Sequence, residues 1–323
     1  MRLGVLDVGS NTVHLLLIDG SPGARPEPYA SHKIPLQLVQ YLDAEGNISQ
    51  EGADALTRFV TSARDFAIEN EAEDLLAFST SAIREAGNGP AVLQQVREQT
   101  GVSLNGISGD QEAAITYFAV RRWQGWSAGR ILDFDIGGGS FEFSTGTNAL
   151  PDAAMSVPLG AGRLTREFFD EQPPKPKQVK RLRKYVREQI APVAENLLRY
   201  GAPDMTVGTS KTFRSLARIC GAAPYSAGPH VKREMHLQDL RLWTRRMEAM
   251  TVSERSDLPG VSKARAEQML AGAIAAEAAM EAFGIETMRV CPWALREGLI
   301  LKRIEHLAEG TGTPVNPKTL LGA

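Results

Sequence analysis

Apolar and polar residues recur along this chain with two periods, one typical of strands and one typical of helices. Runs of β-type residues stand on both sides of a glycine-bearing turn at two places, and each of these predicts a hairpin. The predicted strands lie at 3–8, 12–18, 75–78, 130–136, 141–144 and 205–207. Each hairpin opens one half of the chain.

Apolar residues three and four positions apart predict helices between these strands. The predicted helices lie at 54–68, 92–101, 177–200, 212–220, 237–250, 263–283 and 294–306, with one more that begins after a capping box at 108–111 and buries Ala114, Ile115, Phe118 and Ala119. Segments 79–88 and 208–211 are predicted to be loops, and the Gly-, Thr- and Pro-rich end from Glu309 on is predicted to be disordered. Strands separated by helices predict an α/β fold.

The two predicted hairpins align with each other without gaps. Residues 6–15 match residues 134–143, and both segments read apolar-Asp-apolar-Gly, followed by Ser or Thr three positions after the glycine. Two unrelated glycine turns are the alternative when this match is taken alone. Together with the order of strands and helices, the match favours two duplicated α/β halves.

The aligned turns have the composition of phosphate-binding loops. Backbone N–H groups and hydroxyls of such a turn can converge on one phosphate, and glycine permits close approach. A third segment at a predicted helix start offers a similar set with a lysine, although a surface loop explains it equally well. The candidate phosphate-binding residues are Gly9, Ser10, Asn11 and Thr12; Gly137, Gly138, Gly139 and Ser140; and Gly208, Thr209, Ser210 and Lys211.

Carboxylates near these turns are candidates for holding a metal and for activating water. Asp7 and Asp135 each stand just before a glycine turn, where they can hold a divalent cation against bound phosphates. Glu142 lies on the return strand, where alternation can place it on the side of Ser140. Glu112 lies in the first turn of a predicted helix, where interaction with the helix dipole is the simpler explanation.

Spacing excludes several other motifs. The dinucleotide pattern G-x-G-x-x-G fails because Glu142 occupies the sixth position from Gly137, and Lys211 lacks the preceding glycine of a P-loop. The five histidines have no metal-ligand spacing, and neither H-E-x-x-H nor G-x-S-x-G occurs. Nucleophilic triad chemistry is therefore disfavoured.

Composition narrows the possible partners. The 323 residues include 36 basic and 38 acidic ones, so the net charge of −2 argues against a global attraction to nucleic acid or anionic membrane. Basic residues nevertheless cluster at 175–187 and 211–233, where a solvated helix face is the usual interpretation and an extended polyanion the alternative. Two cysteines, no signal peptide and no apolar run of about 18 residues predict a cytoplasmic protein outside the membrane.

Six motifs follow one another along the chain: DVGSNT at 7–12, TSAIR at 80–84, SGDQEA at 108–113, DIGGGSFE at 135–142, LGAGRL at 159–164 and ALREG at 294–298. In this order they resemble the exopolyphosphatase/guanosine pentaphosphate phosphatase (Ppx/GppA) family of the actin, Hsp70 and sugar-kinase superfamily. The resemblance spans residues 3–302. Six ordered motifs are more specific than one, whereas the superfamily alone leaves the activity open.

The resemblance implies two duplicated actin-like, ribonuclease H-like domains with an active-site cleft between them. We expect domain I at 1–118 plus 295–307, domain II at 119–294 and a disordered tail at 308–323. By position, Glu112 becomes the general base for the attacking water, and Asp135 and Glu142 become ligands of Mg²⁺ or Mn²⁺. Arg84 and Arg265 would hold phosphates beside the glycine loops, because positioning and charge neutralisation supply most of phosphoryl-transfer catalysis.

The implied reaction is hydrolysis of the terminal phosphoanhydride of inorganic polyphosphate, with release of orthophosphate. The chain ends near residue 323 without the extra C-terminal domains of longer family members, so we expect a preference for short chains. Hydrolysis of the 5′ phosphate of pppGpp is one alternative, and an ATP-dependent kinase or a non-hydrolytic nucleotide switch is another. The resemblance also implies a homodimer.

Three residues depart from the family pattern. His14 stands where arginine is usual, Gln111 replaces the first glutamate of a pair, and Phe141 replaces a small hydroxyl residue. We expect these changes to alter phosphate contacts or substrate preference without abolishing activity.

Overall fold

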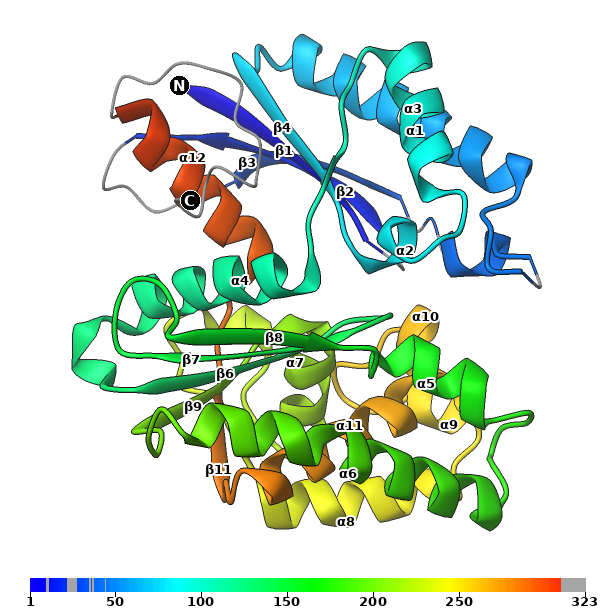
Figure 1. Cartoon of the computed structure of the whole chain (residues 1–323), viewed down its shortest axis with the longest axis vertical. Helices are drawn as coiled ribbons and strands as arrows, with labels where there is room; N and C mark the ends of the chain where they lie inside the picture. The colour runs from blue at the N-terminus through cyan, green and yellow to red at the C-terminus, as the bar shows by residue number, and fades with distance from the viewer. Residues whose placement is uncertain (10–11, 22–27, 35, 37, 44, 309–323) are drawn as a thin grey trace. The chain divides into compact units, whose positions relative to one another are not determined.

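The computed structural model describes residues 1–9, 12–21, 28–34, 36, 38–43 and 45–308, and the chain divides into two units. Unit 1 comprises Met1–Glu112 with Leu295–Ala323, and unit 2 comprises Ala113–Ala294. The division falls inside a helix, α4 (Gly109–Gln124), and the boundary expected from the sequence, at 118, lies in the same helix. Figure 1 shows one twisted β-sheet in each unit.

The two sheets share a strand order. Unit 1 has the order β3-β2-β1-β4-β5, and unit 2 has β8-β7-β6-β9-β11 with β10 added at the edge. In unit 1, β2 is antiparallel to both β1 and β3, and β4 runs parallel to β1. In unit 2, β7 is antiparallel to both β6 and β8, and β9 runs parallel to β6. The strands are β1 (Arg2–Val8), β2 (Val13–Asp19), β3 (Pro28–Ile34), β4 (Asp74–Ser79), β5 (Asn105–Gly106), β6 (Ile131–Ile136), β7 (Phe141–Gly146), β8 (Ala153–Val157), β9 (Met205–Gly208), β10 (Glu234–His236) and β11 (Thr287–Val290). The duplication predicted from the hairpins is therefore confirmed in the topology.

The predicted helices occur in the predicted order, but the helices Ala161–Phe168 and Val252–Ser256 were not predicted, and three segments differ locally. The observed helices are α1 (Gln50–Glu69), α2 (Ser81–Arg84), α3 (Gly89–Thr100), α4, α5 (Ala161–Phe168), α6 (Pro176–Leu198), α7 (Ser210–Ile219), α8 (Leu237–Glu248), α9 (Val252–Ser256), α10 (Lys263–Ala266), α11 (Met269–Ala282) and α12 (Leu295–Ala308), with short 3₁₀ turns at Leu38–Tyr41, Trp126–Ala128 and Tyr225–Ala227. The predicted loop at 79–88 contains α2, and the predicted loop at 208–211 consists of the end of β9 and the start of α7. The predicted helix 263–283 is two helices. Because α11 is buried on every face, its apolar run has no period that marks its beginning.

Unit 1 buries its sheet between helices. Apolar side chains of β1 and β2 pack with Leu56, Phe59 and Val60 of α1, in a core that α3 completes. Helix α12 returns to this unit against β1, and Arg303 on α12 donates to Asp74 Oδ2 at 2.6 Å. The C-terminal helix is thus tied to the N-terminal sheet.

Unit 2 has a larger core on one face of its sheet. Phe134, Phe141 and Phe143 pack against α6 and α11, which lie with α8 on one side of the sheet in Figure 1. Helix α4 covers the other face, where Tyr117 and Val120 contact the sheet. Ile115, Phe118 and Ala119 are buried as predicted, whereas Ala114 is only half-buried. This α4 face of the sheet also carries the acidic residues of β6.

Candidate active site

The two glycine turns close with the same backbone hydrogen bond. Gly9 N donates to Thr12 O at 3.1 Å in unit 1, and Gly137 N donates to Ser140 O at 3.0 Å in unit 2. Ser10 and Asn11, the other two candidates of the first turn, lie outside the described residues. The alignment made from the sequence therefore identifies equivalent turns, each after the first strand of its sheet.

The residue opposite the aspartate differs between the hairpins. Asp7 pairs with His14 across β1 and β2, whereas Asp135 pairs with Glu142 across β6 and β7. Directly opposed side chains of an antiparallel pair lie on the same face, about 5 Å apart at Cβ. The second hairpin thus sets two carboxylates side by side, while the first sets a carboxylate beside an imidazole.

Arg296 of α12 supplies positive charge to the first hairpin. Its Nε lies 3.7 Å from Asp7 Oδ2, and its Nη1 makes a close polar contact with His14 Nδ1. His14 is therefore in contact with an arginine that comes from a distant part of the chain within unit 1. Asp7 is paired with a cation that the protein itself provides.

In unit 2, hydroxyl groups orient the two carboxylates. Thr209 Oγ1 donates to Asp135 Oδ2 at 2.7 Å, and Ser156 Oγ donates to Glu142 Oε1 at 2.8 Å. Glu142 is only 3% exposed, so its charge is largely removed from water. An all-oxygen pair of this kind suits Mg²⁺, which binds through one or two carboxylates and completes its octahedron with water and substrate phosphate oxygens. Asp135 and Glu142 therefore fit a hard divalent cation.

A third carboxyl lies on the same strand face and is deeply buried. Asp133, two residues before Asp135, is 2% exposed, and burial together with the charge of Asp135 raises its pKa well above the usual range. Within the described part of the chain, no cluster of three or more His, Cys, Asp or Glu side chains has the arrangement of a metal site.

The start of α5 holds the second glycine loop. Three consecutive loop carbonyls accept from its backbone: Gly139 O from Gly160 N at 3.2 Å, Gly137 O from Ala161 N at 3.0 Å, and Gly138 O from Arg163 N at 2.9 Å. A Cβ on Gly160 would lie 2.3 Å from the Gly139 carbonyl carbon, so only glycine fits there. In the sequence, the segment LGAGRL stands out only through the family resemblance, because no local signal marks it as the segment that holds the loop.

The third candidate segment also has the properties of a ligand site. Thr209 caps α7, and the next residue, Ser210, has a left-handed φ of 65°, which is strained for a side chain with a Cβ. The buried Ser210 Oγ has no hydrogen-bond partner among the described residues. Strain combined with a buried donor that is left unpaired is typical of a position that contacts a ligand. Lys211 follows at the start of α7, half-buried.

Unit 1 contains an equivalent of this segment that the sequence comparison missed. Thr80 caps α2 with φ −108° and ψ −153°, and Thr209 caps α7 with φ −106° and ψ −162°. Both threonines are followed by serine, and both come after the strand that runs parallel to the hairpin strand. The shared Thr-Ser pair was visible in the sequence as a second repeat, although two residues alone carry little weight.

Arg265 lies on α10 in unit 2. Burial, together with the neighbouring Arg214, lowers the pKa of Arg265 to about 10, while Asp135 acts in the opposite direction. The guanidinium remains charged at neutral pH. Two arginines near one another, one of them also near Asp135, favour the binding of an anion.

Arg84 and Glu112 meet in unit 1. Arg84 Nη1 donates to Glu112 Oε2 at 3.2 Å and to Ile107 O at 2.8 Å, so the guanidinium bridges α2 and the start of α4. Gln111 completes the predicted capping box, because its side chain accepts from Ser108 N at 3.0 Å. Since Gln111 caps the helix, Glu112 is not needed for that role.

The structure thus gathers the candidates into two groups. Unit 1 holds Gly9, Thr12, Arg84 and Glu112, and unit 2 holds Asp135, Glu142, the loop 137–140, the segment 208–211 and Arg265. None of the described helices is both long and apolar enough to cross a membrane.

Known proteins resemble this chain over nearly its whole length. It is 49% identical to exopolyphosphatase 1 of Mycobacterium leprae over 311 residues, which cover 96% of this chain and 92% of that protein. It is 50% identical to exopolyphosphatase 1 of Mycobacterium tuberculosis over the same share of this chain and 90% of the relative. The crystal structure of an exopolyphosphatase from Cytophaga hutchinsonii has the same fold, with a TM-score of 0.84 at 23% identity over 94% of this chain and 98% of that one. Residues 19–307 match the Ppx/GppA phosphatase family. With its duplicated sheets and their glycine turns, the chain belongs to the Ppx/GppA phosphatase family.

Proposed function

We propose that this protein is an exopolyphosphatase that removes the terminal phosphate of inorganic polyphosphate with the help of a divalent metal. The observation that carries the proposal is the Asp135 and Glu142 pair beside a glycine loop that α5 holds in place. The sequence identity of about 50% to the mycobacterial exopolyphosphatases supports the substrate class. Ppx/GppA phosphatases generally depend on a divalent metal, and the oxygen donors of unit 2 suit one.

The residues of unit 2 bind the phosphate end of the substrate in this proposal. The N–H groups of residues 138–140 and the Arg265 guanidinium donate hydrogen bonds to phosphate oxygens, and the Ser210 hydroxyl gains the partner that it lacks. Bound Mg²⁺ or Mn²⁺ would neutralise part of the developing charge on these oxygens. Asp135 and Glu142 hold that ion, each oriented by a hydroxyl group.

Glu112 acts on water. Its carboxylate accepts a proton from a water molecule whose oxygen forms a bond to the terminal phosphorus, and the anhydride bond to the rest of the chain breaks. Arg84 orients the Glu112 carboxylate and contributes positive charge to phosphate binding. Water is the nucleophile, so no covalent enzyme intermediate arises.

The decisive experiment is phosphate release from tripolyphosphate, long polyphosphate, pppGpp and ATP with Mg²⁺, for the wild type and Glu112→Gln. A loss of about 10²- to 10⁴-fold in kcat is expected for the variant. The matched control is Asp110→Asn, which removes a carboxylate from the same first turn of α4 and tests a dipole effect.

Full activity in Glu112→Gln would contradict the mechanism, and equal losses in both variants would favour the dipole explanation. Turnover of pppGpp alone would overturn the substrate assignment, and phosphate transfer from ATP to an acceptor would identify a kinase. The preference for short chains and the homodimer remain predictions.

A further inference from the structure

The first turn of α5 directs its backbone donors at the second glycine loop. Three N–H groups, those of Gly160, Ala161 and Arg163, donate to three consecutive loop carbonyls, 137–139. N–H groups at the start of a helix have no partner inside the helix, so they are available for such contacts. The loop carbonyls therefore point toward the end of α5 that carries a partial positive charge.

The N–H groups of the same three peptide units point the other way. In a planar trans peptide, the carbonyl of one residue and the N–H of the next are directed oppositely, and these three peptide bonds are trans. The N–H groups of Gly138, Gly139 and Ser140 are therefore directed away from α5. None of them donates a hydrogen bond to another described residue. Consecutive backbone donors of this kind suit an anion.

Arg163 adds its side chain to this arrangement. Its Nε donates to Gly139 O at 3.1 Å, so this carbonyl accepts two bonds, the other from Gly160 N at 3.2 Å. Gly139 O and Ser140 N–H belong to the same peptide unit. A hydrogen bond to a carbonyl polarises the N–H of its own peptide, and a charged donor does so more strongly than a neutral one. The guanidinium therefore makes Ser140 N–H a stronger donor.

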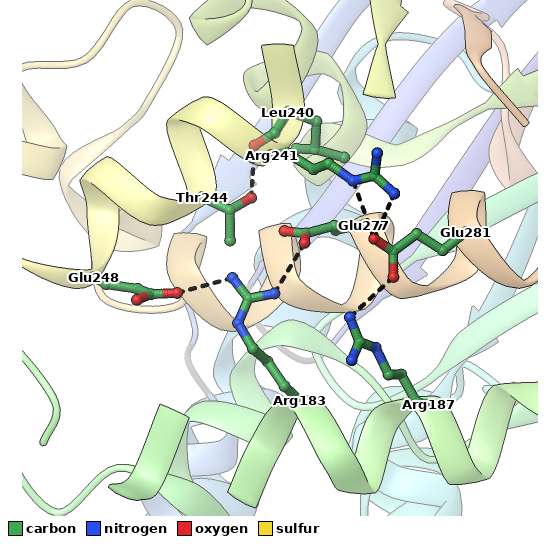
Figure 2. Close-up of polar contacts among 8 residues, drawn as sticks. All are labelled: Arg183, Arg187, Leu240, Arg241, Thr244, Glu248, Glu277 and Glu281. Atoms are coloured by element: carbon green, nitrogen blue, oxygen red, sulfur yellow. Dashed lines mark hydrogen bonds and ion pairs between the residues drawn. The ribbon is translucent and has the colours of Figure 1, made fainter. Parts of the chain in front are cut away.

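Arg183 of α6 is a partly buried arginine with a different kind of partner. It donates to Glu248 of α8 at 2.8 Å and to Glu277 of α11 at 3.0 Å, as Figure 2 shows. Its side chain is 22% exposed, and that of Arg163 is 25% exposed. Arg183 thus joins three helices through carboxylates, whereas Arg163 Nε binds a carbonyl of the candidate active site.

We propose that Arg163 is a positioning residue for phosphate binding, which orients the Ser140 peptide and strengthens its N–H as a donor to a phosphate oxygen. The inference rests on the proposed function for the ligand. Arg163 acts through the Gly139 carbonyl and needs no contact with the substrate. Because the loop holds the phosphate before and during the reaction, the effect should appear in KM and leave kcat nearly unchanged.

The test compares two substitutions of Arg163. Arg163→Met removes both the bond and the charge, so KM for tripolyphosphate with Mg²⁺ should rise about tenfold, while kcat stays within about twofold. Arg163→Gln places a neutral N–H donor at the position of Nε, since both side chains have nitrogen after Cδ. It keeps the bond without the charge, and KM should rise only about threefold.

Two matched controls remove other arginines of unit 2. Arg166→Met removes a charge from the next turn of α5, near Arg163, and none of the bonds to the loop comes from this side chain. Its KM should stay within about twofold of the wild type. Arg183→Met breaks the network in Figure 2, so it should lower the melting temperature and leave KM unchanged.

Amide NMR of the substrate-free protein tests the polarisation directly. The Ser140 amide proton should move upfield in Arg163→Met, because a less polarised N–H is less deshielded. It should keep its position in Arg166→Met and Arg183→Met. In the Glu112→Gln background, tripolyphosphate should bind about tenfold less tightly when Arg163 is replaced by Met, whether or not the wild type hydrolyses it.

Several results would overturn the positioning role. They are an unchanged KM in Arg163→Met, an equal rise of KM in Arg166→Met, and a fall in kcat without a rise in KM. A lower melting temperature of Arg163→Met with an unmoved Ser140 signal would also overturn it, because the side chain would then only stabilise the fold. Absence of phosphate release by the wild type, with the Ser140 shift as expected, would contradict the proposed function alone.

Discussion

The hairpins β1–β2 and β6–β7 have the same backbone but different chemistry. Both place an aspartate just before a glycine turn that is closed by one N–H to carbonyl bond. In the first hairpin the opposed residue is His14, and Arg296 supplies positive charge; in the second it is Glu142, and hydroxyl groups orient both acids. The residue opposite the aspartate, His14 or Glu142, therefore distinguishes the two hairpins. The first is neutralised by an arginine of the protein, and the second is suited to a bound metal ion.

The comparison shows how a duplicated fold can acquire two roles. The sheet topology preserves the position of each turn, while single substitutions decide what the turn can bind. In the proposed mechanism, unit 1 contributes Glu112 and Arg84, and unit 2 contributes the carboxylate pair.

The largest effect is expected from the carboxylate pair. Asp135→Asn or Glu142→Gln should lower kcat/KM at least about a thousandfold, or about 4 kcal/mol, because each removes half of the charge that holds the metal. Asp7→Asn should cost much less, since Arg296 already balances Asp7. Phosphate release at saturating Mg²⁺ measures all three, and equal losses would mean that the hairpins have the same role.

A smaller effect, on stability, is expected where α5 meets the second turn. Gly160→Ala places a Cβ against the Gly139 backbone and should lower the free energy of unfolding by about 3 kcal/mol. Gly106→Ala in unit 1 is the control, because no atom lies within 4 Å of a Cβ added there. Thermal denaturation of both variants gives the comparison, and an unchanged melting temperature for Gly160→Ala would contradict the observed contact.

Arg84→Gln should have an intermediate effect on catalysis. Loss of the guanidinium removes an orienting partner of Glu112 and a cation, so kcat/KM should fall about thirtyfold, or about 2 kcal/mol. Lysine at this position should restore only part of the loss, because it cannot bridge Ile107 O and Glu112 Oε2 with the same geometry. A fully active Arg84→Lys variant would show that charge alone is sufficient.

The smallest effect is expected at Ser210 and Ser81, which occupy equivalent positions in the two units. The same change to glycine should alter the free energy of unfolding in opposite directions at these two serines. Ser210→Gly relieves a left-handed backbone and should raise the free energy of unfolding by up to about 1 kcal/mol, while KM rises through the lost hydroxyl. Ser81→Gly, in the regular turn of α2, should instead lower stability by about 1 kcal/mol. Denaturation measures the stability of both variants, and initial-rate kinetics measure their KM. A Ser210→Gly variant that is less stable than the wild type would show that the left-handed backbone at Ser210 is not strained.

Much of the fold followed from the sequence because periodicity and glycine punctuation are local signals. The inward residues of α6, such as Val186 and Ile190, recur at helical spacing, and both are completely buried. The break before α11 was not visible, since a helix that is buried all round has no amphipathic pattern. The four residues of α2 are likewise too few to establish a period.

The candidate site was predictable only in part, because several of its contacts join residues that are far apart in the sequence. Residue types and spacing identified Asp135, Glu142 and the glycine turns, because their chemistry depends on near neighbours in sequence. The contact between His14 and Arg296 joins residues 282 positions apart, and the Ser156 bond to Glu142 joins the neighbouring strands β8 and β7. Such contacts depend on tertiary structure, which no local pattern encodes. The six motifs identified the family because they sample positions far apart in the chain.

The most direct test of the central claim is a Mn²⁺ titration, followed by electron paramagnetic resonance, of the Glu112→Gln protein with tripolyphosphate. Addition of Glu142→Gln should abolish the high-affinity Mn²⁺ signal, and addition of Asp7→Asn should leave it in place. Retention of the signal without Glu142, together with its loss without Asp7, would contradict the assignment of the metal to the second hairpin.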